Sequence, residues 1–126
     1  MAKFKLIQNP TFKADVMIPR VGGDPMKVPF EFKYLDRTEL AALYADWEDR
    51  HKALGLKIED MDLKEFTAAQ IDIQVGQIKS VVVGWGFDEK LTDENIRILV
   101  SSIASTPSAV LAAYSEAFSQ ARLGNS

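Results

Sequence analysis

The first pattern along the chain is an alternation of apolar and polar residues between residues 12 and 35. The apolar positions of its two halves are Phe12, Ala14, Val16 and Ile18, then Val28, Phe30, Phe32 and Tyr34. A repeat of two is typical of a β-strand, whose successive side chains point to opposite faces. Residues 21–25, between the halves, are rich in glycine, aspartate and proline, which favour turns. The pattern therefore predicts a β-hairpin with a longish loop.

The predicted hairpin needs a covering layer, because two strands alone are only marginally stable in water. Its apolar face either covers the helices that follow or docks onto a neighbouring subunit, and we favour the first interpretation. Both edges of the hairpin are expected to be uncovered. Pro19 and Pro29 each remove a backbone donor, so we expect them to blunt an edge against unwanted pairing.

The segment after the hairpin predicts a helix that begins near Asp36 and ends at Gly55. Either Asp36 or Thr38 could accept hydrogen bonds from the amides of the first turn, and Gly55 is typical of the residue after a helix end. The apolar stripe of this helix is formed by Leu40, Leu43, Tyr44, Trp47 and Leu54. His51 lies one turn beyond Trp47, and we interpret this lone histidine as a packed or boundary side chain, because no second histidine exists to form a metal pair.

A second helix is predicted to begin at Asp62, because Glu65 three residues later completes the pattern of a capping box. The continuation over residues 71–83 is ambiguous between helix and strand. Helical spacing is kept by Ile71, Val75, Ile78, Val82 and Trp85. Residues 71–75 also alternate, and the valines at positions 81–83 favour a strand. We interpret the whole segment as a helix, because the helical period holds for several turns and the start is capped.

Gly84 and Gly86 flank Trp85, which predicts a sharp backbone turn that places the indole in a fixed setting. Thr92 then predicts the start of a third helix, and Pro107 is expected at the first position of a fourth, where its missing amide is tolerated. The apolar stripes of these helices are Ile96, Leu99, Val100 and Ile103, then Val110, Leu111, Tyr114 and Phe118. Residues 123–126 are expected to fray.

Together these elements predict an α+β fold, mainly helical, in which an N-terminal β-hairpin packs on a bundle of about four α-helices. A length of 126 residues suits one domain. We expect a single domain over residues 1–126, with a β-rich part at 1–35, a helical part at 36–122 and a frayed C-terminal end. The hydrophobic content of 47% supplies enough apolar material for a core.

Charge and composition narrow the function classes. The net charge of −3 argues against nucleic acid as a partner, because phosphate-binding domains carry a basic excess. The absence of cysteines excludes disulfides and thiolate metal sites. No apolar run reaches the roughly 20 residues of a membrane span, and the first residues lack the apolar core of a signal peptide. We therefore expect a cytoplasmic protein without a membrane, metal or cofactor partner.

Several features follow one another in a recognisable order. They are Val28-Pro29-Phe30 in the β-rich part, Leu43-Tyr44-Ala45-Asp46-Trp47, Val83-Gly84-Trp85, the helix start Leu91-Thr92-x-Glu94-Asn95, and a Pro-x-Ala helix that ends near Tyr114. In this order the chain resembles the tail assembly chaperones of long-tailed bacteriophages, the siphoviruses of the lambda type. The resemblance covers roughly residues 11–118 and rests on the Gly-Trp pair, a capped helix start and apolar spacing rather than on a chemical signature.

The resemblance implies a non-enzymatic protein that acts in the host cell cytoplasm. Such a protein would hold the tape measure protein soluble, promote polymerisation of the tail tube protein, associate with further copies of itself into a ring or stack, and be absent from the mature virion. It implies no catalytic residue and no cofactor. Trp85, with Gly84 and Gly86, is the position most expected to match a family feature. Trp47, Tyr114 and Phe118 are further candidates for protein interaction or for structure.

Three alternatives remain open from the residues. An enzyme is disfavoured, because the carboxylates lie at caps and turns, only one histidine is present, and Gly84-x-Gly86 lacks the third glycine of a dinucleotide motif. A helical DNA-binding regulator is disfavoured, because Arg97 is the only basic residue between residues 96 and 118. A different structural or completion protein of a phage tail is the third.

Overall fold

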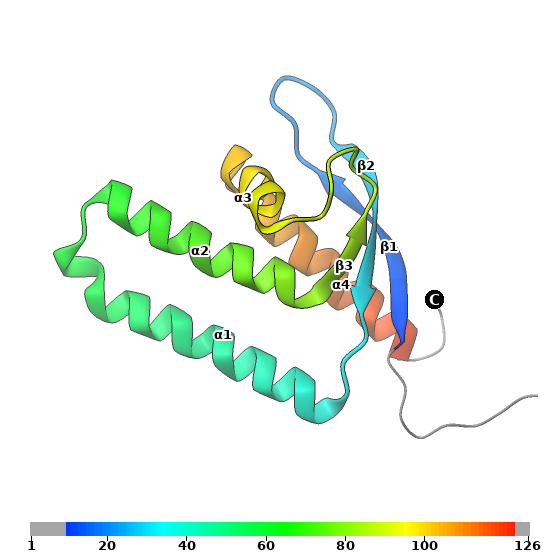
Figure 1. Cartoon of the computed structure of the whole chain (residues 1–126), viewed down its shortest axis with the longest axis horizontal. Coiled ribbons are helices and arrows are strands. Elements are labelled where there is room, and N and C mark those ends of the chain that lie inside the picture. The colour runs from blue at the N-terminus through cyan, green and yellow to red at the C-terminus, as the bar shows by residue number, and fades with distance from the viewer. Residues whose placement is uncertain (1–9, 123–126) are drawn as a thin grey trace, which may run out of the picture.

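The computed structural model describes the backbone of residues 10–122 and the side chains of residues 10–119. The elements in chain order are β1 (Thr11–Ile18), β2 (Met26–Lys33), α1 (Arg37–Lys57), the 3-10 turn η1 (Ile58–Asp60), α2 (Leu63–Val81), β3 (Val82–Trp85), α3 (Asp93–Ser102) and α4 (Thr106–Arg122). This confirms the predicted α+β, mainly helical fold (Figure 1). The expected fraying of residues 123–126 lies outside the described residues.

The predicted hairpin is confirmed, and a third strand joins it. Strands β1 and β2 pair antiparallel with Phe12 opposite Phe32 and Val16 opposite Val28, so the apolar positions share one face. The sheet order is β1-β2-β3, with Phe30 opposite Trp85. Strand β2 is therefore central, and one of the two hairpin edges that we expected to be uncovered is occupied by β3.

The prediction that residues 71–83 are helical throughout is wrong for its last two residues. The helical period holds as far as Val81, where α2 ends, and residues Val82–Trp85 form β3. Helix and strand patterns both fitted this segment, and the unpaired backbone groups of β2 decide between them, because a strand satisfies them and a longer helix would not. The pairing is irregular between Glu31 and Phe32, which is typical of a β-bulge.

Pro29 has a different role from the one predicted. It lies in the central strand opposite Asp15, and its carbonyl accepts a hydrogen bond of 2.8 Å from the Gly86 amide. The N–H and C=O of one strand residue point to the same side. The Pro29 carbonyl faces Gly86, the residue after β3, so the N–H that Pro29 lacks would have faced the same segment. Pro29 therefore limits the pairing of β2 with β3 and does not blunt an outer edge.

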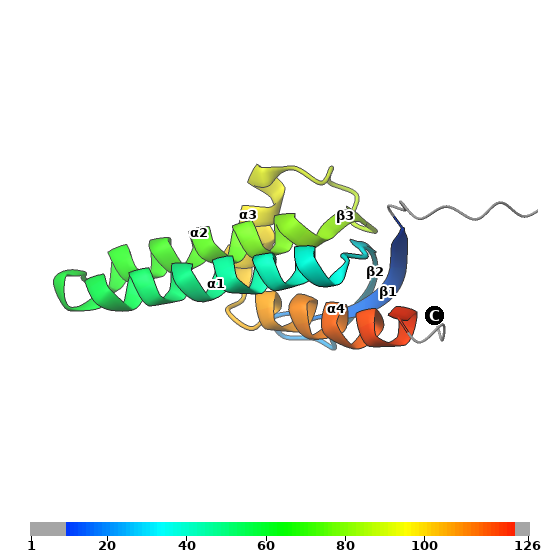
Figure 2. The ribbon, with the colours of Figure 1, turned by 90° about the horizontal axis from the view of Figure 1, so that it is seen from below.

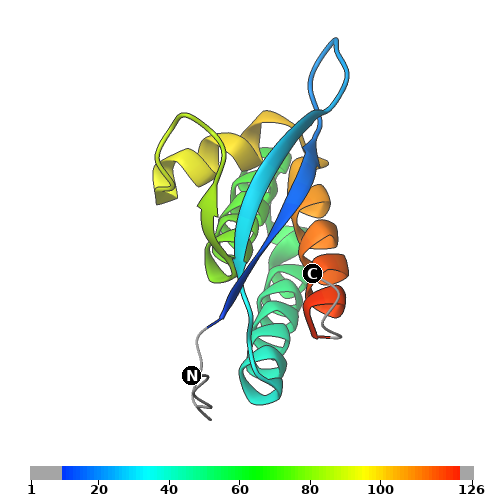
Figure 3. The ribbon, with the colours of Figure 1, turned by 90° about the vertical axis from the view of Figure 1, so that its right-hand side faces the viewer.

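One face of the sheet packs against the helices, and the core lies between them. Figure 3 shows the sheet in front of α2 and α4. The most completely buried large side chains are Tyr114, Phe30, Phe32, Ile78, Val16, Val81 and Val110. The opposite face of the sheet carries exposed residues of alternating charge, including Lys13, Asp15 and Lys27. This one-sided burial is the pattern of an antiparallel sheet with a single covered face.

The predicted helix starts are confirmed in detail. The Asp36 and Asp62 carboxylates accept hydrogen bonds of 2.8 Å and 2.7 Å from the Glu39 and Glu65 amides, and both helices have a complete capping box. The Thr92 hydroxyl accepts a 3.1 Å hydrogen bond from the Asn95 amide at the start of α3. These bonds satisfy amides that have no partner within their own helix.

Two helix boundaries differ from the prediction. Helix α1 continues through Gly55 to Lys57 and passes into η1, so Gly55 does not terminate it. Among the described residues only Gly22 has a positive φ, so Gly55 keeps helical geometry, at a cost of about 1 kcal/mol relative to alanine. Helix α4 begins at Thr106, which makes Pro107 its second residue, a difference of one position that lies within the uncertainty of helix boundaries.

Helices α1 and α2 form an antiparallel pair that extends away from the sheet, and we call residues 37–81 the arm (Figures 1 and 2). Helix α1, which the structure describes completely, has no buried residue. Of its predicted stripe, Leu43 and Trp47 contact the core while Tyr44 is exposed. In contrast, α2 buries Ile73, Val75, Gln77, Ile78 and Val81 near the sheet. The outer helix of the arm is thus held by partial contacts alone.

We expect the amides of α1 to exchange with solvent hydrogen faster than those of residues 73–81. The free energy needed to open a segment locally ranges from about 0 to the free energy of unfolding the whole protein. Segments with few buried apolar contacts open most easily, so their amides exchange fastest. Native-state hydrogen exchange monitored by mass spectrometry or NMR measures the difference. Equal protection of α1 and the buried end of α2 would show that the arm opens only with the whole fold.

Candidate protein-binding site

Trp85 lies at the end of β3, where the chain leaves the sheet toward α3. Its indole Nε1 donates a hydrogen bond of 2.8 Å to the Glu89 carbonyl. Its ring meets Phe87 edge-on with a centroid distance of 5.1 Å, and meets Phe30 edge-on at 6.1 Å. The indole is half-buried. These contacts hold Trp85 in one orientation, as the sequence predicted for the indole, and they close the loop that follows β3. The sharp turn predicted around Trp85 does not include Gly84, because Val82–Trp85 form a strand and the chain bends only from Gly86 onward.

Gly86 is required by a close approach of the backbone to Pro29. A Cβ atom on Gly86 would lie 2.7 Å from Cδ and Cγ of Pro29, which is shorter than any ordinary carbon contact. The same backbone makes the hydrogen bond from Gly86 to the Pro29 carbonyl. Gly84 is less restricted, because its Cβ would lie 3.5 Å from the Glu31 carboxylate. Of these two glycines, only Gly86 is therefore sterically essential.

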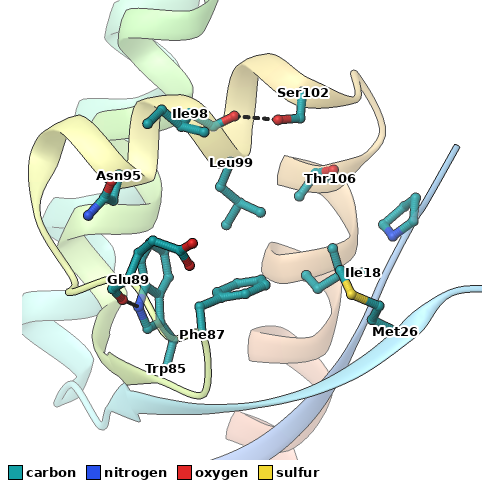
Figure 4. Close-up of a pocket in the computed structure, with 11 residues that line it drawn as sticks. Ile18, Met26, Trp85, Phe87, Glu89, Asn95, Ile98, Leu99, Ser102 and Thr106 are labelled. Carbon is teal, nitrogen blue, oxygen red and sulfur yellow. Dashed lines mark hydrogen bonds between the residues drawn. The ribbon is translucent and has the colours of Figure 1, made fainter.

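A pocket of about 300 Å³ opens beside Trp85, and we call it the Trp85 pocket. It is lined by Ile18, Pro19, Met26, Trp85, Phe87, Glu89, Asn95, Ile98, Leu99, Ser102 and Thr106. These residues come from the loop end of the hairpin, from the segment after β3, from α3 and from the start of α4 (Figure 4). Mainly apolar walls with a few polar groups are typical of a binding pocket.

The polar groups of the Trp85 pocket are mostly satisfied by their own chain. Asn95 donates a 2.8 Å hydrogen bond to the Lys90 carbonyl, and Ser102 donates one of 2.6 Å to the Ile98 carbonyl. The Glu89 carboxylate is different, because it has no hydrogen bond or salt bridge within the described residues. Figure 4 shows the Glu89 side chain extending across the indole of Trp85 toward the pocket. The pocket therefore combines an apolar interior with a carboxylate at its mouth.

Tyr114 and Phe118 lie apart from this pocket, in an aromatic cluster of the core. The cluster consists of Phe12, Phe32, Tyr34, Tyr114 and Phe118. The rings of Tyr34 and Phe118 stack with centroids 4.6 Å apart, and those of Phe32 and Tyr114 are 5.4 Å apart. Such pairs add about 0.5–1.5 kcal/mol beyond area burial. Of the two uses predicted for Tyr114 and Phe118, this placement supports the structural one.

The Tyr114 hydroxyl is an exception within the core. Its oxygen is buried and has no hydrogen-bond partner among the described residues. Burial raises the pKa of this hydroxyl above its ordinary value of 10.0, and the neighbouring Tyr44 and Tyr34 raise it further. Because a buried hydroxyl without a partner is destabilising, Tyr114 stabilises the fold through its ring and not through its oxygen.

Trp47 and His51 lie on α1, between the sheet and the far end of the arm. Trp47 is half-buried against the core, and its ring centroid lies 5.4 Å from that of the exposed Tyr44. His51 Nε2 lies 3.3 Å from Nε2 of Gln77 on α2. His51 is thus a boundary side chain that contacts the other helix of the arm, as predicted. The structure does not bring Trp47 to the Trp85 pocket.

The far end of the arm carries apolar residues that our reading of the sequence missed. Leu56 and Leu63 have 87% and 80% of their surface exposed, and Ile58 between them is also exposed. We call these three residues, with Lys57 and Lys64, the arm tip. The predicted helix end at Gly55 hid this feature. The available signal was three large apolar residues around the junction of two helices, where polar turn residues are usual.

Residues 10–122 contain no group of three or more His, Cys, Asp or Glu side chains that could hold a metal ion. Within the same range, no single helix is long and apolar enough to cross a membrane, and α3 and α4 pass that test only as a pair bent by 109°.

Comparison with known protein families matches residues 1–125 to the phage tail assembly chaperone family. The chain belongs to this family. The match confirms the resemblance drawn from the order of sequence features. No curated protein and no solved structure matches the chain in the two other comparisons. A phage tail assembly chaperone interacts with tail proteins and acts in the host cell, and membership of a chaperone family supports a non-catalytic role.

Replacing Gly86 with alanine should destabilise this chaperone by about 1–3 kcal/mol, because the added methyl group must displace the Pro29 ring or the β2–β3 pairing. Gly55→Ala is the matched control, since nothing lies within 4 Å of a Cβ at that helical position, and it should stabilise by about 0.5–1 kcal/mol. Guanidinium unfolding of both variants measures the changes. If Gly86→Ala left the free energy of unfolding unchanged, β3 would be able to separate from β2 without a cost in stability.

Tyr114→Phe should leave the free energy of unfolding unchanged or raise it by up to about 1–3 kcal/mol, because it removes a desolvated hydroxyl. Tyr114→Ala should lower it by about 3–5 kcal/mol. The wild type should also lose stability as the pH rises above 10.0, the ordinary pKa of the phenol, since the raised folded pKa favours the protonated form in the native state. Tyr114→Phe should reduce this alkaline loss.

Unfolding titrations at neutral and alkaline pH measure both effects on Tyr114. A Tyr114→Phe variant that is clearly less stable than the wild type would contradict the interpretation, because it would mean that the hydroxyl has a stabilising partner.

Proposed function

We propose that this tail assembly chaperone holds the tape measure protein in soluble form until the tail tube polymerises around it. The observation that carries the proposal is the family match over residues 1–125. The structure supports it with large apolar side chains that remain exposed at several separate places. A long helical protein with apolar stripes aggregates unless those stripes are covered, and a chaperone in many copies can cover them through avidity.

The side of the arm that carries the partly buried apolar stripe of α1 is the surface that we assign to the tape measure protein. Helix α1 spans Arg37–Lys57 and buries none of its residues, so an apolar stripe along a helix of about 30 Å stays partly accessible. Tyr44, 43% exposed, marks its most open aromatic position, beside the half-buried Trp47. A helix that is incompletely covered along its length fits a partner that is itself a long amphipathic helix.

The wider role follows from the same proposal. The chaperone recruits tail tube protein to the coated tape measure protein, associates with further copies of itself, and leaves before the virion is complete, in the host cell cytoplasm. It performs no reaction and binds neither nucleic acid nor membrane. Self-association matters physically because each exposed patch is small. Many copies along one partner convert weak single contacts into stable coating.

The charge distribution supports this role over a DNA-binding regulator. Helices α3 and α4 meet at 109°, an angle that also occurs in helix-turn-helix motifs. However, Arg97 on α3 is paired with Asp72 on α2, and the described exposed side of α4 carries serines and Glu116. Phosphate-contacting helices need unpaired basic residues.

Co-expression with the tape measure protein should raise the soluble fraction of that protein, and Tyr44→Gln should reduce the gain. Tyr44 is exposed on a helix without buried residues, so the variant should fold normally. The measurement is the amount of tape measure protein in the supernatant and its co-purification with tagged chaperone. Leu111→Gln on α4, outside the arm, would be too disruptive as a control because Leu111 packs against the core.

Val21→Ser is the suitable control, since Val21 is exposed in the hairpin loop and lies off the arm. It should retain the full gain. Equal solubility of the tape measure protein with and without wild-type chaperone would overturn the proposed function.

A further inference from the structure

The sheet order β1-β2-β3 leaves one side of β1 without a neighbouring strand in the described part of the chain. Figure 3 shows this strand at the margin of the sheet, with α4 behind it. Strand β1 runs for 8 residues, contains no proline, and pairs with β2 without a register shift. Proteins usually protect such an edge, because its backbone groups can pair with any extended chain. The edge of β1 therefore needs a cover.

The register of the hairpin shows which backbone groups point to the open side. In an antiparallel pair, opposite residues alternate between those that exchange hydrogen bonds and those that do not. The Tyr34 amide donates a 3.0 Å hydrogen bond to the Pro10 carbonyl, which fixes where the alternation starts. The residues bonded to β2 are therefore Phe12, Ala14, Val16 and Ile18. The N–H and C=O groups that face the open side belong to Thr11, Lys13, Asp15 and Met17.

The core is also incompletely covered along this edge. Among the core-facing residues of β1, Phe12, Val16 and Ile18 are buried, whereas Ala14 is only half-buried. Ala14 lies opposite Phe30 of the central strand, so it occupies the middle of the pairing and not an end. An apolar side chain on an added strand would complete the cover at this position.

We propose that residues 2–6 of the same chain form a strand that pairs antiparallel with the open edge of β1. These residues precede the described part of the chain, and they read Ala2-Lys3-Phe4-Lys5-Leu6. Apolar and basic positions alternate in them, which is the pattern of a strand that buries one face. The inference goes beyond the proposed function and does not depend on it.

The short connection to β1 limits the register of this pairing. Pro10 is already aligned opposite Tyr34, so only residues 7–9 can carry the chain back along the edge. Residue 7 is three steps from Pro10, which an extended chain spans in at most about 11 Å. Because the chain must also reverse its direction, residue 7 can lie beside Thr11 but cannot reach Lys13. The resulting three-residue connection is a common length for a hairpin.

In this register the apolar side chains of the segment meet the core face of β1. Phe4 lies opposite Ala14, where the core is incompletely covered, and Leu6 lies opposite Phe12. Cross-strand pairs of aromatic and apolar residues stabilise a sheet. A shift of one residue would instead turn both lysines of the segment toward the core, so the apolar pattern and the connection length select the same pairing.

The two lysines of the segment have opposite electrostatic surroundings in this register. Lys3 lies opposite Asp15, which attracts it, whereas Lys5 lies opposite Lys13, which repels it. A favourable or unfavourable cross-strand charge pair changes the pairing equilibrium by up to about fivefold. Replacement by glutamate should therefore weaken the pairing at position 3 and strengthen it at position 5.

Closing this edge has a consequence for the whole molecule. The backbone groups of β1 would already be paired, so the sheets of separate chaperone molecules could not join edge to edge. The exposed apolar side chains elsewhere on the molecule would stay accessible to partners. Recognition would then use side-chain surfaces, while the open backbone edge would be closed by the chain itself.

Hydrogen exchange of the full chain, followed by NMR, tests the pairing residue by residue. With the segment in place, the amides of Lys13 and Asp15 should be protected from exchange. An open edge would protect only the alternate amides that bond to β2, such as that of Val16. An Hα–Hα nuclear Overhauser effect between Phe4 and Ala14 should report the register, because residues of a pair without hydrogen bonds lie closest together.

Phe4→Ser should lower the protection of the Lys13 and Asp15 amides by about tenfold, the loss expected for a partly buried aromatic side chain. The protection of Val16 should stay unchanged. Lys3→Glu should lower the protection of the same two amides by about two- to fivefold, and Lys5→Glu should raise it by a similar factor. Each of these two variants is the matched control for the other, because both make the same change in net charge.

Fast exchange of the Lys13 and Asp15 amides in the wild type would overturn the proposal. So would an unchanged Phe4→Ser variant, or glutamate variants at positions 3 and 5 that shift protection in the same direction. Protection that rises with protein concentration would overturn it as well, because another copy would then cover the edge. None of these results bears on the solubility of the tape measure protein, so failure here is separate from failure of the proposed function.

Discussion

Burial of one face of β2 is the constraint on which the rest of the structure depends. Phe30 and Phe32 are almost completely buried from this strand, and each such side chain contributes about 1.5–3 kcal/mol relative to an exposed one. Helix α4 packs along β1 and sets Tyr114 against Phe32. Strand β3 pairs with the other edge of β2 and places Trp85 beside Phe30. Removing this face would leave no surface for the helices to cover.

Stability is concentrated near the sheet and decreases along the arm. Buried residues of α2 all lie in its second half, close to β3, and α1 has none along its described length. Most helical stability in proteins comes from packing of an apolar face, so α1 depends on capping, partial contacts and exposed ion pairs such as Asp46 with Arg50. Tyr44, Leu56, Ile58 and Leu63, four of the eight large apolar side chains that are exposed in the described residues, lie on this arm, the part of the fold that contributes least to the core.

The Trp85 pocket arises from a chain of local requirements. Pro29 limits the β2–β3 pairing, and only a glycine at position 86 fits against its ring. The hydrogen bond from Trp85 to the Glu89 carbonyl then closes the loop, which leads to the Thr92 cap and orients α3. The Trp85 pocket is the space left between this loop, α3 and the hairpin. Its apolar walls follow from backbone geometry that also stabilises the fold, so the same residues shape the pocket and hold the loop.

The sequence by itself determined the elements whose signals are local. Alternation located β1 and β2, and the Asp36, Asp62 and Thr92 caps located three helix starts, because a strand face and a capping bond each involve residues close together in the chain. The glycines around Trp85 predicted a turn there, and the chain does bend from Gly86 onward, although Gly84 lies within β3. Local pattern could not decide residues 82–85, where helix and strand periods overlap, nor the continuation of α1 through Gly55.

Only the tertiary structure decided those points and assembled the surfaces. The edge of β2 made residues 82–85 a strand by offering backbone partners far away in sequence. Distances between elements determined that the stripe on α1 is only partly buried, that Tyr114 is buried without a described partner for its hydroxyl, and that Ile18, Trp85 and Leu99 line one pocket. The physical reason is that burial and shape belong to the arrangement of elements, and an apolar stripe looks the same in the sequence whether or not another layer covers it.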